Sequence, residues 1–223
     1  MRPWFEVKPE VYSGLQNLLS EHYPSLHTLI ELECVYLRGA LPIVVDGKEI
    51  DRFQIEIEFP HNYPYDIPIV RETAGQIEKI GDRHFNSDDT ACLFLKDESY
   101  KHYSPDSTIV DFIEVCVKNF FMWQIEYDLT GGKPTRKARA HGILGTIEFY
   151  REELEVDSIE TVIKFLEYHT SKKVKGHWIC YCGSGKELRR CHLEKVRDLR
   201  VKIPKKYATN SIAALKAFSK SQY

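Results

Sequence analysis

One cysteine lies in a segment whose residue types suit nucleophilic chemistry. Residues 84–93 read His-Phe-Asn-Ser-Asp-Asp-Thr-Ala-Cys-Leu, so Cys92 follows a histidine, an asparagine and two carboxylates. Four consecutive residues of this run favour turns and side-chain-to-backbone hydrogen bonds, whereas a cysteine in apolar sequence is usually a small buried side chain. A thiol on such a loop can be reached by an incoming ester, which makes Cys92 a candidate nucleophile.

Three further cysteines and a histidine crowd together near the end of the sequence. Cys180 and Cys182 form a Cys-x-Cys pair, a Gly-Ser-Gly turn follows, and Cys191 and His192 complete the pattern. Four such ligands in one short loop are typical of tetrahedral Zn²⁺ in a structural site. Because this site has no open coordination position, we expect the zinc to fold a segment too short for its own core and to do no chemistry.

Composition places the chain among globular proteins. Its 223 residues are 43% hydrophobic and 29% charged, enough for one main core and a smaller appendage. The N-terminus lacks the apolar stretch of a signal peptide, and no run approaches the roughly 18 apolar residues of a membrane span. We therefore expect a cytoplasmic protein.

The net charge of -2 conceals an asymmetry. Residues 171–223 contain 14 Lys or Arg and 3 Asp or Glu, a balance of +11, which leaves residues 1–170 at -13. A basic tail of this kind can bind an acidic protein, nucleic acid or the protein's own acidic body, and charge alone does not choose among them.

The hydrophobic pattern predicts an α+β fold. An amphipathic helix is expected over 10–23, and alternation predicts strands over 28–37 and 52–59. The Asp46-Gly47 turn signal between short β-prone runs favours an antiparallel meander, and no β-α-β alternation is present. The first strand would place Cys34 on a core face, with Ile30 and Leu32 beside it.

The second part of the pattern is helical. Residues 59–70 contain three prolines and are expected to cross the sheet edge, and Ser104-Pro105 is expected to open a helix that buries Cys116. Two more helices are predicted over 143–152 and 158–169, the second opened by Asp157.

Residues 1–152 resemble the ubiquitin-conjugating (E2) family. Three stretches carry the resemblance: Phe59-Pro60-x-x-Tyr63-Pro64-x-x-x-Pro68-x-Val70, His84-x-Asn86-x-Asp88-x-Thr90-x-Cys92-Leu93 and Tyr103-Ser104-Pro105-x-x-Thr108-Ile109. The eukaryotic His-Pro-Asn is replaced by His84-Phe85-Asn86, and the stretch from Asn86 to Cys92 is shorter. In both respects the sequence looks more like the E2-like proteins of bacterial operons.

The resemblance implies a UBC-like fold, a four-stranded meander flanked by helices, and a two-step acyl transfer. Cys92 would accept a protein C-terminus as a thioester, and a lysine amine would then attack that thioester. Asn86 would support the loop or stabilise the oxyanion, and His84, with Arg83 beside it, would favour the thiolate. Of the acidic and histidine side chains that can orient the lysine, His141 ranks first; the others are Asp88, Asp89, Asp97, His102 and Asp128.

The cysteine-rich segment resembles the SEC-C motif, a small zinc module found at the ends of many bacterial proteins. The expected organisation is a UBC-like domain over 1–152, a helix and linker over 153–175, the zinc module over 176–193, and a basic tail with a short helix over 194–223. Proteins of this appearance are often encoded in antiphage (CBASS-type) operons beside a cyclic-oligonucleotide synthase of the cGAS-like type. The resemblance implies that the synthase C-terminus is the acyl donor.

Three alternatives stay open at this point. The first is a noncatalytic E2 variant that acts as an adaptor, with Cys92 an incidental thiol. The second is a thiol hydrolase with a Cys92-His dyad, in which water takes the acyl group. In the third, the basic tail binds nucleic acid and the E2-like domain is a scaffold.

Overall fold

The computed structural model describes residues 2–135, 139–140 and 142–221, which divide into two compact units. Unit 1 comprises Met1–Phe94 and His102–Lys137, and unit 2 comprises Leu95–Lys101 and Ala138–Tyr223. The division differs from the expected boundary at residue 152, because α5 (Gly142–Leu154) buries its apolar side chains in the core of unit 2. Nothing in the described residues forms a helix long and apolar enough to cross a membrane.

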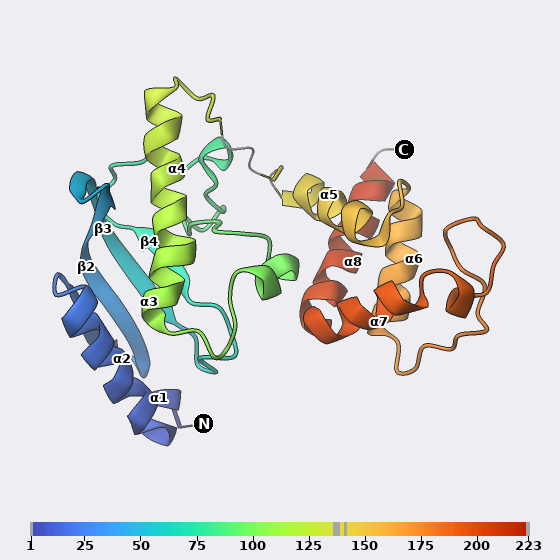
Figure 1. The fold of residues 1–223 in the computed structure, drawn as a ribbon, viewed down its shortest axis with the longest axis horizontal. Coiled ribbons are helices and arrows are strands. Elements are labelled where there is room, and N and C mark those ends of the chain that lie inside the picture. Colours follow the sequence, from blue (N-terminus) through green and yellow to red (C-terminus); the bar gives the residue numbers. More distant parts are fainter. Residues whose placement is uncertain (1, 136–138, 141, 222–223) are drawn as a thin grey trace. The chain divides into compact units, whose positions relative to one another are not determined.

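Unit 1 is built on a four-stranded antiparallel sheet in the order β1-β2-β3-β4, as the α+β prediction requires (Figure 1). The strands are β1 (Leu26–Glu31), β2 (Cys34–Val45), β3 (Lys48–Phe59) and β4 (Ile69–Glu72). Val45 pairs with Lys48 across Asp46 and Gly47, whose φ values of 50° and 77° are those of a type I′ turn. The Asp46-Gly47 hairpin is therefore confirmed.

The predicted strand over 28–37 is wrong, because a second tight turn divides it. Leu32 and Glu33 have φ values of 48° and 62°, and Glu31 pairs with Cys34 across them. Leu32 is 95% exposed. Cys34 is half-buried, so its expected place in the core is also wrong.

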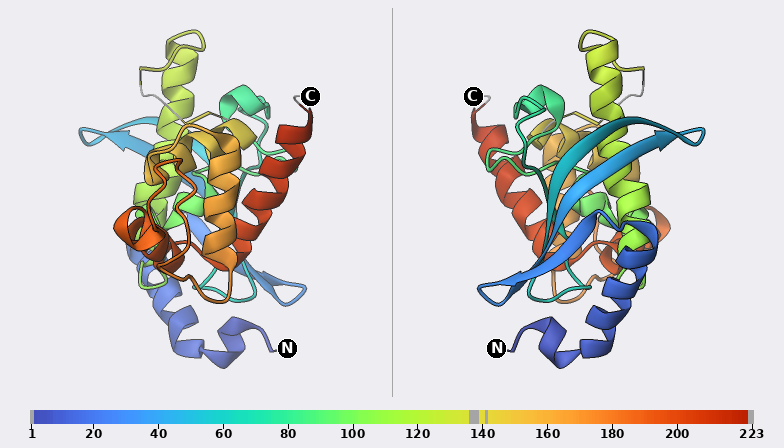
Figure 2. Two further views of the ribbon diagram at one scale, coloured as in Figure 1. Left: turned by 90° about the vertical axis from the view of Figure 1, so that its right-hand side faces the viewer. Right: turned by 90° about the vertical axis from the view of Figure 1, so that its left-hand side faces the viewer.

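One face of the sheet carries the core of unit 1. Alternate β3 residues from Phe53 to Phe59 are buried against α2 (Pro9–His22) and against a helical run formed by α3 (Ile109–Phe112), η3 (Ile113–Val117) and α4 (Lys118–Leu129). Figure 2 shows α4 behind the strands in its right-hand view, and the short helix α1 (Trp4–Val7) precedes α2. Cys116 is buried in this core, as predicted.

The helical run begins later than the sequence suggested. Thr108 is its N-cap: Thr108 Oγ1 accepts from the Asp111 N–H, and an Asp111 carboxylate oxygen accepts from the Thr108 N–H. Pro105 lies in the turn before it, so the predicted start at Ser104-Pro105 is wrong. The helix begins after Thr108 and not at Pro105, because the capping box at Thr108 satisfies two amide donors at once.

Unit 2 is helical, with α5, α6 (Ile159–Thr170), α7 (Leu193–Lys202) and α8 (Lys205–Ser221) around one core. Ser158, not Asp157, caps α6 by accepting from the Thr161 N–H at 3.2 Å. Residues 194–223 were expected to form a tail with a short helix, whereas α7 and α8 bury Leu199 and Leu215 in the core. Two 3₁₀ turns belong to this unit, η2 (Lys96–Lys101) and η4 (Leu188–Arg190); η1 (Gly81–Arg83) belongs to unit 1.

Gly39 of β2 provides a test of the register between β1 and β2. Its φ is +147°, and a Cβ at this position would lie 2.0 Å from the Ser25 carbonyl oxygen. We expect Gly39→Ala to lower the free energy of unfolding of unit 1 by more than about 2 kcal/mol, measured by urea denaturation.

Gly14 of α2 is the matched control, because a Cβ there meets no atom within 4 Å. Gly14→Ala should leave stability unchanged or raise it by up to about 1 kcal/mol, as alanine favours the helix. Equal unfolding midpoints for the two variants would contradict the close approach at Gly39.

Candidate functional site

Main-chain hydrogen bonds fix the loop that carries Cys92. The Ala91 N–H donates to the Val70 carbonyl of β4 at 2.8 Å, and the Cys92 N–H donates to the His84 carbonyl at 2.8 Å. Phe85 and Ala91 form an isolated antiparallel bridge between these two bonds. The thiol-bearing residue is half-buried. Cys92 therefore lies on a loop fastened to the edge of the sheet, with part of its side chain open to solvent.

Side chains of the same loop close a tight turn. Asn86 Nδ2 donates to Thr90 Oγ1 at 2.9 Å, and Thr90 Oγ1 donates to Asp88 Oδ1 at 2.6 Å. The Thr90 hydroxyl bond holds the pKa of the Asp88 carboxyl below its usual range, and the charge of Arg71 on β4 adds to this effect. The Asn86 side-chain amide thus supports the loop. Thr90, which the sequence marked only as part of a motif, is the residue that joins Asn86 to Asp88.

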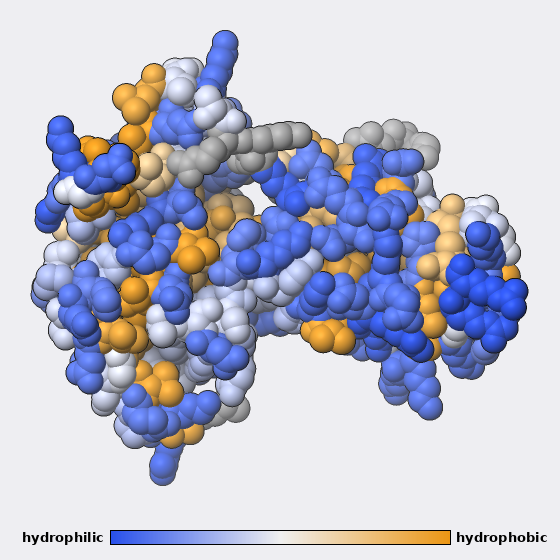
Figure 3. All heavy atoms as spheres, in the orientation of Figure 1, coloured by the Kyte–Doolittle hydropathy of each residue, from blue (hydrophilic) through white to orange (hydrophobic). Residues whose placement is uncertain are grey.

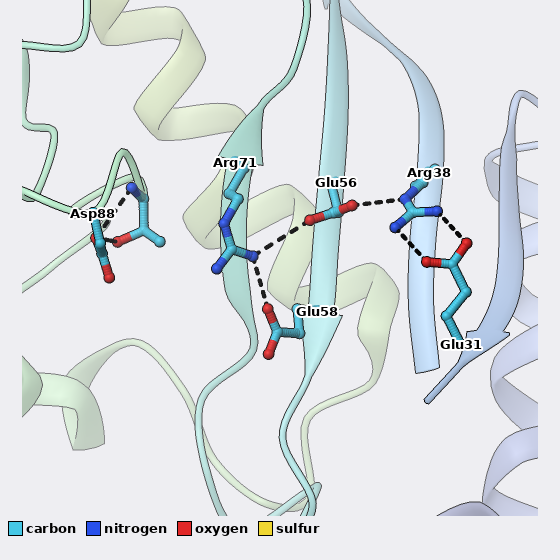
Figure 4. A network of polar contacts seen from close by, with 7 residues as sticks. Glu31, Arg38, Glu56, Glu58, Arg71 and Asp88 are labelled. Carbon is cyan, nitrogen blue, oxygen red and sulfur yellow. Dashed lines mark hydrogen bonds and ion pairs between the residues drawn. The ribbon is translucent and has the colours of Figure 1, made fainter. Parts of the chain in front are cut away.

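Asp88 continues a row of charges across the polar face of the sheet (Figure 4). Arg71 pairs with Glu58 at 2.8 Å and Glu56 at 3.4 Å, and Arg38 pairs with Glu56 at 2.6 Å. Arg38 of β2 lies between Glu31 of β1 and Glu56 of β3, and Arg71 of β4 pairs with two carboxylates of β3, so the row of ion pairs connects all four strands.

The predicted basic neighbours of the thiol are oriented by α4. The His84 ring packs edge-to-face on Trp123, with 4.7 Å between centroids. The buried Arg83 guanidinium forms an ion pair with Asp128 and lies 4.7 Å from the Tyr127 ring centroid. Because Asp128 compensates its charge, Arg83 is a poor source of positive potential for Cys92. Trp123 was not recognised from the sequence, since a helical tryptophan also fits an ordinary core.

The side chains expected to orient the lysine are divided between the two units. Asp97 belongs to unit 2, where the hydroxyls of Tyr150 and Ser211 donate to its carboxylate. His102 belongs to unit 1, is exposed and stacks on Phe94 at 5.1 Å. Asp89 is exposed on the cysteine loop, and His141 lies outside the described residues.

Unit 2 contains the second candidate site, the predicted metal cluster. The ligand atoms of Cys180, Cys182, Cys191 and His192 all lie within 4.8 Å of one another, so these residues can hold a metal ion. Cys180 Sγ lies 3.2 Å from His192 Nδ1, Cys191 Sγ lies 3.1 Å from the same nitrogen, and the Sγ atoms of Cys182 and Cys191 are 3.5 Å apart.

The separations of 3.1, 3.2 and 3.5 Å are slightly shorter than, or at the lower end of, those between the ligand atoms of a tetrahedral ion. With metal–sulfur bonds of about 2.3 Å and metal–nitrogen bonds of about 2.1 Å, tetrahedral ligand atoms are roughly 3.5–3.8 Å apart. Burial raises the pKa of the Cys180 thiol to about 12. A cation at the centre would favour the thiolate instead, which is how metal binding and folding become coupled.

Main-chain contacts and two glycines shape the loop that carries the four side chains. Ile179 and Glu187 form an antiparallel bridge, and the Cys180 N–H donates to the Lys186 carbonyl at 2.9 Å. Gly183 and Gly185 have φ values of +83° and +69°, which a residue with a Cβ rarely adopts. The Gly-Ser-Gly turn therefore returns the chain so that the Cys-x-Cys pair meets Cys191 and His192.

Comparisons of the chain with protein-family models, curated proteins and solved structures gave no match. Two sites follow from the geometry. Unit 1 presents a half-buried thiol on a fixed loop, and unit 2 presents four side chains that can hold a metal ion.

Thr90→Val tests whether the turn holds the cysteine loop. The variant keeps the shape of a side chain that is 6% exposed but removes the hydroxyl that bonds Asn86 and Asp88. Losing bonds of this kind costs about 1–3 kcal/mol, so amide hydrogen exchange at Asn86 and Cys92 should accelerate roughly 5- to 150-fold. Exposed Ser87→Ala in the same turn is the control. Unchanged exchange in Thr90→Val would contradict this role.

Proposed function

We propose that the protein is an E2-like conjugating enzyme that carries an acyl group on Cys92 as a thioester and transfers it to an amine. The observation that carries the proposal is the position of Cys92, half-buried on a loop that the Ala91 N–H fastens to β4 and the Gln124 side chain fastens to α4. The order of meander, proline-rich crossing, cysteine loop and long helix supports it, since the E2-like motifs occur in that order.

The chemistry needs no redox cofactor. In the first step the Cys92 thiolate attacks an activated carbonyl, a carbon–sulfur bond forms, and the activating group leaves with its electron pair. In the second step a neutral amine attacks the thioester, the carbon–sulfur bond breaks, and the Cys92 thiolate is released as an amide forms. The proton lost by the amine goes to a base or to water.

The neighbouring residues take supporting roles in this scheme. Asn86 holds the loop through Thr90, and His84, oriented by Trp123, lies two residues before Asn86 on the same loop. The family resemblance assigns to His141 the task of orienting or deprotonating the amine. Asp128 and Asp97 are left out, because each is engaged with a partner of its own.

The acyl donor and acceptor are proteins in this proposal. The resemblance to E2-like proteins of antiphage operons implies the C-terminus of a cGAS-like nucleotidyltransferase as donor and a lysine of a target protein as acceptor. The sequence contains no nucleotide-binding glycine loop, so ATP-driven activation of the carboxylate would either be carried out by a separate protein or be bypassed.

We further propose that Cys180, Cys182, Cys191 and His192 hold structural Zn²⁺ in a SEC-C-like module. The ligand set of three sulfurs and one imidazole nitrogen supports zinc, and the four protein ligands leave no position for a substrate. The His192 ring packs on Phe165 of α6 at 5.0 Å, so the ligands are built into the unit 2 core. The metal would therefore stabilise α6 and α7 along with the loop.

Trapping at residue 92 tests the conjugation. The chain is co-expressed with its operon neighbours as wild type, Cys92→Ser and Cys92→Lys, and intact mass is measured with and without dithiothreitol. We expect a thiol-sensitive adduct on the wild type, an ester on Cys92→Ser and a stable amide on Cys92→Lys, because the attacking atom sets the stability of each bond.

Cys34→Ser is the matched control, as Cys34 is also a half-buried thiol in unit 1, 3.8 Å from the His61 Nε2 atom. Cys34→Ser should form the same thiol-sensitive adduct as the wild type, in the same amount. Absence of any adduct on all forms would exclude the acyl carrier and leave the adaptor. Hydrolysed donor without an adduct on Cys92→Lys would identify a hydrolase.

Removal of one ligand tests the metal site. Wild-type chain should contain one zinc per molecule by elemental analysis, and Cys182→Ala should lose most of it because three ligands bind far more weakly than four. Cys34→Ala should retain the metal. Stoichiometric zinc in Cys182→Ala would contradict the assignment of the ligands.

A further inference from the structure

Three aromatic rings form a stack beside the metal cluster of unit 2. Tyr168 of α6 lies between Trp178 and Tyr181, with centroids 4.9 Å and 4.7 Å away and interplanar angles of 27° and 19°. The Tyr168 hydroxyl donates to the Ile179 carbonyl at 3.0 Å, and the Leu188 N–H donates to the Trp178 carbonyl at 2.7 Å. The stack is therefore fixed by both the helix and the cysteine-rich loop.

The stack opens into a groove of about 450 Å³. Its lining residues are Glu167, Tyr168, Ser171, Trp178, Ile179 and Tyr181. The Lys164 ammonium lies 5.2 Å from the centroid of the Tyr181 ring, at one end of the stack. Trp178, which is half-buried, forms the other end of the stack.

The same segment has an excess of unpaired positive charge. Residues 171–192 contain six Lys or Arg and one acidic residue. Five of the six are exposed and form no ion pair with any residue that the structure describes: Lys172, Lys173, Lys175, Lys186 and Arg190. In Figure 3, strongly hydrophilic residues gather beside hydrophobic ones at the end of unit 2 where this segment lies in Figure 1.

The acidic residues near the groove are neutralised. Glu167 on the rim pairs with Lys216 at 2.7 Å, and Glu187 pairs with Arg189 at 2.7 Å. A polyanion that enters the groove therefore meets unpaired cations and no free carboxylate among these side chains. Exposed flat rings together with a basic track are the features that bind single strands, since bases stack on the rings while phosphates meet the cations.

We propose that the segment 171–192 binds single-stranded nucleic acid, with a base stacking on Trp178 in the groove and phosphates contacting Lys172, Lys173 and Lys175. In a duplex the faces of the bases are stacked on one another, so a duplex would contact only the lysines and would not stack on Trp178. An acidic peptide would likewise leave the ring of Trp178 without a partner. This activity goes beyond the proposed conjugation and needs no thioester chemistry.

The test is fluorescence anisotropy of the full-length, zinc-loaded chain with labelled 12-nucleotide oligo(dT) and oligo(U), over a series of salt concentrations. Both strands should bind, and affinity should fall with salt because counterions are released. Trp178→Ala should weaken binding by about 5- to 150-fold, the effect of losing one stacked base. Trp178→Phe should recover part of that loss, which separates stacking from a folding defect.

A charge variant tests the phosphate contacts. The triple change Lys172→Gln, Lys173→Gln and Lys175→Gln should weaken binding and reduce the salt slope by about 2, since each single-strand contact contributes about 0.7. The control removes the same charge at exposed lysines elsewhere, Lys48→Gln, Lys133→Gln and Lys220→Gln, and should bind like wild type.

Several results would overturn the proposal. They are no binding of either strand, equal loss in the two triple variants, a duplex bound as tightly as the single strand, or poly-glutamate competing as well as an unlabelled strand. Binding of oligo(U) but not oligo(dT) would support it and identify RNA as the ligand, because the 2′-hydroxyl distinguishes the two. Binding of oligo(dT) alone would support it and identify DNA.

Discussion

The hydrogen bonding of one irregular segment is the constraint on which the cysteine site depends. Between β4 and α3 the chain has no strand or α-helix, and its backbone donors and acceptors need partners outside regular structure. They find them in β4, through Ala91, and in α4, where Gln124 Nε2 donates to the Arg83 carbonyl at 2.8 Å. Because both β4 and α4 belong to the core of unit 1, the loop is held in place by the sheet and by the helix. A thiol on this loop is held in one place without being buried.

The features that the sequence predicted well are those decided by local chemistry. Asp46-Gly47 adopts positive φ at low cost, so the hairpin could be placed to the residue, and the apolar period from Ile109 to Phe120 gave the buried face of the long helix. The cluster of three cysteines and one histidine could also be predicted from the sequence. Its four residues lie within a stretch of thirteen, and a Gly-Ser-Gly turn returns the chain between them.

The features that it missed are those decided by distant partners. Leu32 and Glu33 carry no turn signature, and their positive φ values follow from the pairing of Glu31 with Cys34. The neighbours of Cys92 are oriented by Trp123 and Asp128, which lie more than thirty residues further along the chain. Residue type and spacing were therefore enough to single out Cys92 as a candidate, whereas the surroundings of His84 and Arg83 depend on the packing of α4 against the loop.

The two units are linked through the cysteine loop itself. Only Leu93, Phe94 and Leu95 separate Cys92 from η2, whose Asp97 is buried in unit 2 and accepts from the hydroxyl of Ser211 at 2.9 Å. Burial raises the pKa of the Asp97 carboxyl, so this anchor is held by neutral donors in an apolar core. A displacement of η2 would therefore act on the chain only three residues after Cys92. A metal ion held by Cys180, Cys182, Cys191 and His192 would stabilise the unit that contains this anchor, and the covalent chain connects that unit to the cysteine loop.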